Sequence, residues 1–225
     1  MIITHWIIDY CFLLYGKALM IFYKNPPKHY LSYVKNGKIP VILIPGISNR
    51  WGFLKNLGDK ISYSGHPLYV VNGLGLNRLD ISYSAKIVKE LIEKMHLNKA
   101  VIVAHSKGGL IGKYYLTHEN KDKKIKGLIA IAAPFSGSKI ARHLAKKYSK
   151  ELSPQSETIQ SLNQHAEVNS RIISIMPEFD NHVWHEKGSY LEGAINIKTK
   201  TKGHHKIVFD KGVQDKITKL IEKFN

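Results

Sequence analysis

The chain has 225 residues, 44% of them apolar, and its 34 Lys and Arg residues against 17 Asp and Glu residues give a formal net charge of +17. This length suits one well-buried core and is short for two independent domains, and the ordinary composition excludes a disordered or repetitive chain. A single cysteine, Cys11, excludes an internal disulfide framework and a cysteine-based zinc site, and it fits a reducing, cytoplasmic location.

The excess of positive charge predicts attraction to an anionic partner, such as an acidic lipid surface, nucleic acid or an anionic substrate. The lysines are scattered along the chain, with local densities at 121–126, 146–150 and 198–206. No basic helix or set of stacking aromatic residues accompanies them, so nucleic acid is not the expected partner. Because net charge bears on solubility and association rather than on fold, a solvated cationic surface is the simplest interpretation.

Residues 1–39 are expected to form an apolar, helical N-terminal segment. Between Trp6 and Tyr23 only Asp9 and Lys17 are charged, and at ~100° per residue these two lie ~80° apart on a helix, on a narrow polar edge. The stretch lacks the basic start and small-residue cleavage site of a secretory signal, and its two charges argue against a spanning helix. Two interpretations stay open. Residues 1–24 lie flat on an anionic membrane, or they pack on the core or cover the substrate entrance.

From residue 40 onward, short runs of branched apolar residues alternate with segments of helical periodicity. The runs indicate strands buried on both faces, and they lie at 41–44, 68–71, 100–104, 128–133, 171–176 and 194–197. Between them, Asp80 is placed to cap a helix that continues to Met95, and further helices are expected over 109–117 and 213–224. This alternation predicts an α/β fold over 40–225, with a mainly parallel central sheet, helices on both faces and the ligand site at the carboxyl edge of the strands.

The sequence Ala104-His105-Ser106-Lys107-Gly108 follows one of these strands and precedes a helix. The order strand, serine, helix is typical of a nucleophile elbow, where a sharp turn exposes the serine hydroxyl and admits only small residues two positions to either side. Here those positions hold Ala104 and Gly108. Ser106 is therefore the predicted nucleophile, and the helix that starts behind it favours developing negative charge.

This segment resembles the Gly-His-Ser-x-Gly-Gly elbow of lipases and esterases in the α/β-hydrolase superfamily, with Ala104 in place of the usual glycine. The resemblance covers about residue 40 to the C-terminus, and in that family the acid and then the histidine follow the serine along the chain. It implies an aspartate in the loop after a late strand, where Asp180 fits together with Val183, Ser189 and Leu191, and Glu178 is the alternative.

For the base, the resemblance implies a Gly-His pair after the last strand and before the final helix. Gly203-His204 occupies this place, and the neighbouring His205 is a competitor. The oxyanion hole needs two backbone N–H donors, which the resemblance places at Lys107, directly after the nucleophile, and at Ile47, in the loop after the first strand.

These assignments predict a serine hydrolase that cleaves ester or lipid substrates through a Ser106–His204–Asp180 triad and an acyl-enzyme, with no metal or other cofactor. His182, His185 and Glu186 are close in sequence, but nothing orders them as metal ligands. The alternative function is a cationic, membrane-associated binding protein on a non-catalytic hydrolase scaffold. Residues 135–167 are expected to form a small cap or lid over the site, or a cover for the sheet edge.

Overall fold

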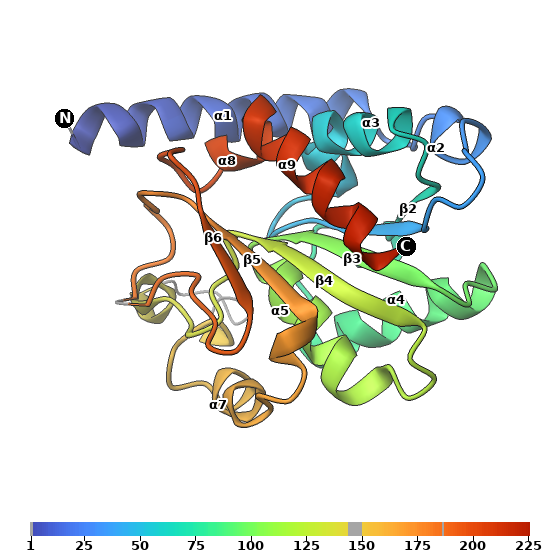
Figure 1. Cartoon of the computed structure of the whole chain (residues 1–225). Helices are drawn as coiled ribbons and strands as arrows, with labels where there is room; N and C mark the ends of the chain where they lie inside the picture. The colour runs from blue at the N-terminus through green and yellow to red at the C-terminus, as the bar shows by residue number, and fades with distance from the viewer. Residues whose placement is uncertain (1, 144–149, 186) are drawn as a thin grey trace.

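The computed structural model describes residues 2–143, 150–185 and 187–225, and it confirms the predicted α/β architecture (Figure 1). The described residues form a six-stranded sheet with the order β2-β1-β3-β4-β5-β6, and every neighbouring pair is parallel. The strands are β1 (Val41–Ile44), β2 (Leu68–Val70), β3 (Ala100–His105), β4 (Ile125–Ile131), β5 (Ile172–Met176) and β6 (Ile195–Lys198). The strand order reverses between β1 and β3, which is where open parallel sheets bind ligands.

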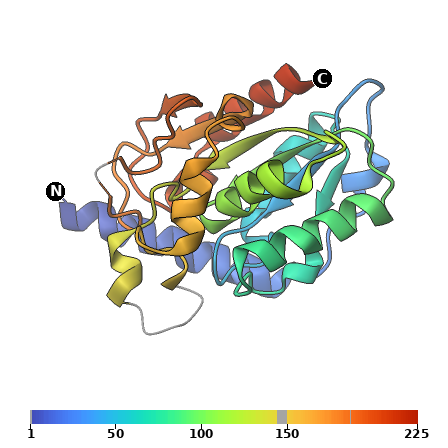
Figure 2. The same cartoon turned by 90° about the horizontal axis from the view of Figure 1, so that it is seen from below.

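Helices cover both faces of this sheet, as Figures 1 and 2 show. The helices of eight residues or more are α1 (Ile2–Phe22), α3 (Lys55–Tyr63), α4 (Ile81–Lys94), α5 (Lys107–Tyr114), α7 (Glu157–Gln164) and α9 (Lys211–Ile221). The short helices α2 (His29–Ser32) and α8 (Lys206–Phe209) and the 3₁₀ helix η1 (Trp51–Leu54) join them, and α5 continues into a π-helical turn over Tyr115–Glu119. Helices α4, α5 and α7 lie on one face, and α1, α3, α8 and α9 lie on the other.

Alternate residues of the central strands point to opposite faces and build two separate apolar cores. Ile42, Ile44 and Ile102 face the α4 and α5 side, whereas Val41 and Val101 face the α3 and α9 side. All five are fully buried, which explains why the strands appear in the sequence as continuous apolar runs rather than as alternating patterns.

The prediction that the Asp80 side chain caps α4 is wrong. Asp80 does stand at the start of α4, but its side chain makes no capping hydrogen bond. Instead the carboxylate of Glu151 accepts the N–H of Ile81 at 3.0 and 3.1 Å. The free donor at the start of this helix is therefore satisfied by a residue 70 positions away, which the local sequence does not reveal.

Helix α1 lies along the α3 and α9 side of the molecule (Figure 1) and packs against the body of the protein. By length and composition alone it could cross a membrane. Its polar edge faces inward, because Asp9 is fully buried, and Gly16 is packed so tightly that an added Cβ would lie 2.3 Å from the ring of Phe53. Many of its apolar side chains point outward, and Ile3, Leu14 and Phe22 are all more than two-thirds exposed.

Candidate active site

Ser106 lies at the turn between β3 and α5 in a strained backbone conformation. Its φ is +53° and its ψ is −124°, a region that residues other than glycine seldom adopt. The turn is tight on both sides: a Cβ added at Gly108 would lie 2.6 Å from the carbonyl oxygen of Ile44, and Ala104 is fully buried. The sheet and the following helix therefore hold the Ser106 hydroxyl in one place, in the arrangement that the sequence predicts.

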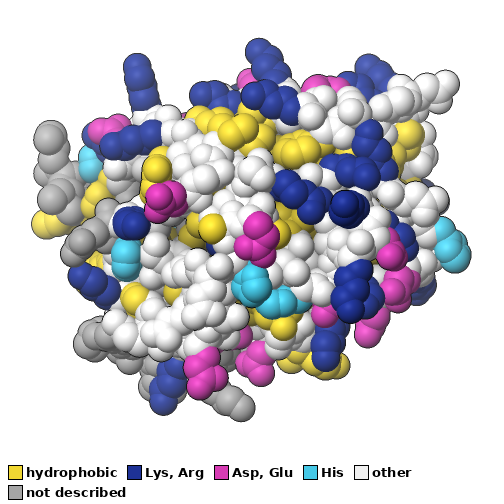
Figure 3. Space-filling model, turned by 60° about the horizontal axis from the view of Figure 1, so that its bottom comes forward, with side chains coloured by type: hydrophobic (Ala, Val, Ile, Leu, Met, Phe, Trp, Pro, Cys, Tyr) yellow, Lys and Arg dark blue, Asp and Glu magenta, His cyan; other side chains and the backbone are white. Residues whose placement is uncertain are grey.

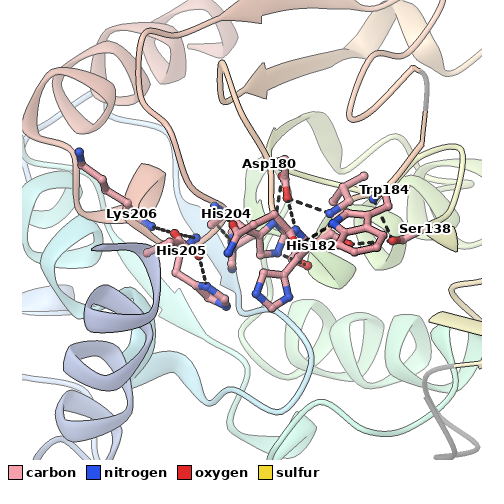
Figure 4. A network of polar contacts seen from close by, with 12 residues as sticks. Ser138, Asp180, His182, Trp184, His204, His205 and Lys206 are labelled. Atoms are coloured by element: carbon pink, nitrogen blue, oxygen red, sulfur yellow. Dashed lines mark hydrogen bonds and ion pairs between the residues drawn. The ribbon is translucent and has the colours of Figure 1, made fainter. Parts of the chain in front are cut away.

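The structure brings the predicted base and acid to this serine. His204 Nε2 lies 3.0 Å from Ser106 Oγ, and His204 Nδ1 lies 3.0 Å from Asp180 Oδ2. The other oxygen of Asp180 accepts the backbone N–H groups of His182 and Val183, both at 2.8 Å. Asp180 is thus fixed by its own loop next to His204 (Figure 4). It can hold Nδ1 of His204 while Nε2 faces Ser106.

The backbone around His204 is fixed by two further side chains. Asn181 Oδ1 accepts the N–H of His204 at 3.1 Å, and His105 Nε2 donates to the His204 carbonyl oxygen at 3.0 Å. Both lie next to residues that the sequence singles out, namely Asp180 and Ser106, but nothing local in the sequence indicates that they contact His204.

Neighbouring charges and burial shift the pKa values of His204 and Asp180 in opposite directions. Burial alone would lower the pKa of His204, but the charge and hydrogen bond of Asp180 and the charge of Asp9 outweigh burial, so the pKa lies above its ordinary value. Burial raises the pKa of Asp180, but the charge of His204 and the hydrogen bonds to its oxygens bring it below its ordinary value. Asp180 is therefore a carboxylate at neutral pH, and its negative charge favours the protonated form of His204.

The alternative residues have other partners. His205 Nδ1 lies 2.8 Å from Oδ2 of Asp9, a residue of helix α1, so His205 belongs to a second Asp–His pair. Glu178 lies 3.6 Å from the ammonium of Lys202. Among the hydrogen bonds of the described residues, the side chain that reaches Ser106 Oγ is His204.

The two residues expected to form the oxyanion hole lie in different segments, Lys107 directly after the serine and Ile47 in the loop after β1. Lys107 is the first residue of α5, so its backbone N–H has no acceptor within the helix, and its ammonium donates to the Leu79 carbonyl. Ile47 follows Gly46, and a Cβ added at Gly46 would lie 3.2 Å from the Cβ of Ser106. The loop after β1 therefore approaches the nucleophile closely, and the donor roles of Ile47 and Lys107 stay predictions.

A pocket of about 250 Å³ opens beside Ser106. It is lined by the loops that carry Ser106, Ile47 and His204, by the segment after β4 and by helix α1: Leu13, Lys17, Gly46, Ile47, Ser48, Asn49, His105, Ser106, Pro134, Ser138, Ile140, Ala141, Leu152, His182, Val183, His204 and His205. Of these, Ser138, Ile140, Ala141 and Leu152 belong to the expected cap, whose residues 144–149 lie outside the described residues. Leu13 and Lys17 bring α1 to the wall of this pocket, in agreement with the interpretation that residues 1–24 pack on the core or cover the substrate entrance.

Among the described residues, Asp9, His182 and His205 place one donor atom each within 4.8 Å of one another, as a metal site requires. The carboxylate of Asp9 is already used, since it accepts the N–H of His205 at 2.7 Å, the N–H of Lys206 at 2.8 Å and the proton of His205 Nδ1. A metal there would have to displace this proton. Of the cluster considered from the sequence, Glu186 lies outside the described residues.

Comparison with known proteins agrees with the fold. A family model described as "Lecithin:cholesterol acyltransferase" matches residues 78–222, which is more than half of the chain. No curated protein matches in sequence.

Solved structures give the same fold at low identity. The mature lipase BlEst2 of Bacillus licheniformis is 14% identical with a TM-score of 0.68, and the alignment covers 88% of this chain and 96% of that one. Lipase B of Aspergillus fumigatus is 17% identical with a TM-score of 0.68, over 88% and 55% of the two chains. The monoacylglycerol lipase of Paleococcus ferrophilus is 13% identical with a TM-score of 0.59, over 84% and 97%. With its elbow, its parallel sheet and the family match over residues 78–222, this chain belongs to the lecithin:cholesterol acyltransferase family, within the α/β-hydrolase superfamily.

Proposed function

We propose that the chain is a carboxylic-ester hydrolase of the lipase and esterase type, with Ser106 as nucleophile, His204 as base and Asp180 as the residue that orients the base. The observation that carries this proposal is the continuous series of contacts from Ser106 Oγ through both nitrogens of His204 to Asp180, each at 3.0 Å. These distances are within the range for direct proton transfer between a nucleophile and its base.

The reaction follows from this geometry. His204 takes the proton of Ser106 as its oxygen attacks the ester carbonyl, and the backbone N–H groups of Ile47 and Lys107 bind the oxyanion. The imidazolium of His204 then protonates the leaving alcohol, which leaves an acyl group on Ser106. Water, deprotonated by His204, hydrolyses this acyl-enzyme and restores the serine.

The pocket indicates a substrate with a small acyl group. At about 250 Å³ its volume lies just below the usual range of ligand sites, which is about 300 to 1,000 Å³. Ile140, Ala141 and Leu152 give it an apolar wall. We infer that the described residues of 135–167 act as the cap that shapes this wall, and that short to medium acyl chains fit best.

A fluorophosphonate probe tests the nucleophile directly. We expect one labelled serine per chain, with labelling and p-nitrophenyl ester hydrolysis both lost in Ser106→Ala. Ser64→Ala, which changes a serine at the end of α3 far from the pocket, is the matched control and should behave as the unaltered chain. Absence of labelling in the unaltered chain would instead favour the non-catalytic binding scaffold.

The name of the matching family refers to acyl transfer to an alcohol rather than to water. An acyl-enzyme on Ser106 can give its acyl group to either acceptor, because the same base activates both. Analysing products with and without an added long-chain alcohol distinguishes the two. A dominant acyl-alcohol product would redefine the enzyme as a transferase while leaving the triad unchanged.

We also propose that the outward face of α1 binds an anionic membrane. Ile3, Ile7 and Leu14 are 74%, 60% and 68% exposed on this face, and they line a shallow groove together with Trp6, Tyr10 and Cys11. The net charge of +17 complements an anionic bilayer, and on the face shown in Figure 3 the Lys and Arg side chains are spread widely rather than gathered into one patch. A helix whose charges face the protein and whose apolar side chains face outward is suited to lie on a lipid surface.

Cys11 provides the test, since it is the only cysteine in the sequence and is exposed on α1. An environment-sensitive fluorophore on Cys11 should shift to shorter wavelength with vesicles containing phosphatidylglycerol, and less with pure phosphatidylcholine. Leu14→Glu should abolish this shift, whereas Tyr83→Glu, an exposed apolar position on α4, should not. An unchanged spectrum with both vesicles, or self-association through α1 detected by sedimentation, would overturn the membrane proposal.

A further inference from the structure

Helix α1 contacts both loops that carry the proposed chemistry. Its two charged residues, Asp9 and Lys17, lie eight positions apart, so a helix places them on one edge, about two turns from each other. In the structure this edge faces the catalytic end of the sheet, and each charge bonds to a different loop. Asp9 bonds to a residue 196 positions away, and Lys17 bonds to a residue 31 positions away.

Asp9 binds the segment directly after His204. One carboxylate oxygen accepts the backbone N–H groups of His205 at 2.7 Å and Lys206 at 2.8 Å, and the other accepts His205 Nδ1 at 2.8 Å. The carboxylate is fully buried, and a Cβ added at Gly203 would lie 2.4 Å from it. The residues on both sides of His204 are thus packed against or bonded to one side chain of α1.

Lys17 binds the loop after β1. Its ammonium donates to the carbonyl oxygen of Ser48 at 2.6 Å and to Oδ1 of Asn49 at 2.7 Å. The same loop is held from another direction by Asn77, whose amide donates to the carbonyl oxygen of Pro45 at 2.7 Å. Lys17 therefore fixes the backbone just after Ile47, where the oxyanion donor is expected.

We propose that α1 is a part of the active site, in which Asp9 positions the loop of His204 and Lys17 positions the loop of Ile47. This inference rests on the proposed hydrolase function. Neither residue touches the reacting atoms, so both act through the groups that they hold. Because a displacement of about 1 Å in such groups can cost about 100-fold in rate, two rigid contacts of this kind matter for catalysis.

A purely structural role for α1 makes different predictions. Removing Asp9 or Lys17 would then lower the melting temperature without changing the folded enzyme. A positioning role lowers kcat in fully folded protein and leaves KM for a small soluble ester unchanged, because the pocket itself persists.

Asp9 has a second signature in the pH dependence. The groups that face His204 are Asp180 and His182 from the loop after β5, His105 from β3, His205 from its own loop and Asp9 from α1. Asp9 is a carboxylate in the folded protein, because its hydrogen bonds to His205 and Lys206 overcome burial and bring its pKa far below the ordinary value. Its charge favours protonated His204, so removing it moves the acidic limb of kcat/KM to lower pH.

The experiment compares charge-removing variants of the full chain. Asp9→Asn and Lys17→Met are assayed with p-nitrophenyl acetate from pH 5 to pH 9, after titration of active serines with fluorophosphonate and measurement of the melting temperature. The matched controls are Asp215→Asn and Lys60→Met, which break an exposed ion pair between α9 and α3.

We expect kcat per active serine to fall about 10- to 100-fold in both test variants, with KM within about twofold of the unaltered chain. The acidic limb should move to lower pH in Asp9→Asn and stay in place in Lys17→Met, and the controls should match the unaltered chain. Asp9→Asn keeps an oxygen that can accept the N–H groups of His205 and Lys206, so it should fold even where Asp9→Ala does not. The effect of the Asp9 charge on kcat can therefore be measured in a folded variant.

Variants with kcat within about twofold of their controls, or with losses explained by the unfolded fraction alone, would overturn the inference while leaving Ser106 as the nucleophile. Failure of the unaltered chain to react with the fluorophosphonate would overturn both the inference and the proposed function.

Discussion

Two neighbouring histidines of this protein each pair with an aspartate, and the two pairs do different things. His204 Nδ1 lies 3.0 Å from Asp180 Oδ2, and His205 Nδ1 lies 2.8 Å from Asp9 Oδ2, so the contacts of the two Nδ1 atoms are nearly identical. They differ at the second nitrogen, because Nε2 of His204 meets Ser106. Under the proposed function, the partner of this nitrogen, rather than the aspartate, distinguishes the base His204 from His205, which holds a loop.

The pKa values of the two rings are shifted in opposite directions. The charges of Asp180 and Asp9 outweigh burial at His204 and raise its pKa, whereas burial lowers the pKa of His205 despite the hydrogen bond to Asp9. Under the proposed function, the raised pKa suits the His204 ring to accept the serine proton, whereas the His205 ring is favoured in its neutral form and donates its Nδ1 proton to Asp9.

Replacing each histidine in turn should give the largest difference in kcat between the two pairs. His204→Ala removes the base and should lower kcat about 10⁵- to 10⁶-fold, whereas His205→Ala removes one of the hydrogen bonds that hold the loop and should cost about 10-fold. Steady-state hydrolysis of p-nitrophenyl acetate measures both. Comparable losses in the two variants would show that His205 takes part in the chemistry and would contradict the assignment.

Removing the aspartate of the first pair should have the next largest effect. Asp180→Asn leaves the size of the side chain unchanged but favours the wrong tautomer of His204, so kcat should fall about 10⁴-fold. Circular dichroism and the melting temperature verify folding. A loss no larger than that of Asp9→Asn would mean that the two pairs contribute equally.

The pH profile sharpens the distinction further. His204 must be neutral to accept the serine proton, and its pKa lies above the ordinary value of about 6.5, so kcat/KM of the unaltered chain should fall as the pH drops through a midpoint above 6.5. Of the two carboxylates, Asp180 raises the pKa of His204 more than Asp9 does. Asp180→Asn should therefore move this midpoint to lower pH by more than Asp9→Asn does. A midpoint that stays in place in Asp180→Asn would contradict the electrostatic account of the first pair.

The sequence predicts the first pair better than the second for a physical reason. Ser106 is recognisable because its strand, its small neighbours and its helix are adjacent along the chain, so the pattern that marks the turn is a local one. Asp180 and His204 follow from the order of elements in the resembling family, and the structure brings them to the serine.

The second pair depends on contacts that no local pattern contains. Asp9 is 196 residues away from His205 and Lys17 is 31 residues away from Ser48, so the sequence shows a polar edge on a helix but not what that edge faces. The same applies to Glu151, which takes the capping role that local rules assign to Asp80. Long-range hydrogen bonds of this kind depend on how the layers pack, which only the folded chain determines.

Gly203 joins the two pairs, and its replacement gives the smallest expected effect, on stability. Its φ of +124° is accessible mainly to glycine, and an added Cβ would lie 2.4 Å from the carboxylate of Asp9. Gly203→Ala should therefore lower the free energy of unfolding by about 3 kcal/mol, from backbone strain together with displacement of Asp9. Gly37→Ala is the matched control, because its φ of +80° is also unfavourable but nothing lies within 4 Å of the added Cβ, and it should cost about 1 to 2 kcal/mol. Urea unfolding measures both, and equal costs would mean that Asp9 moves aside freely, in which case its contacts with the His204 loop are too weak to position the base.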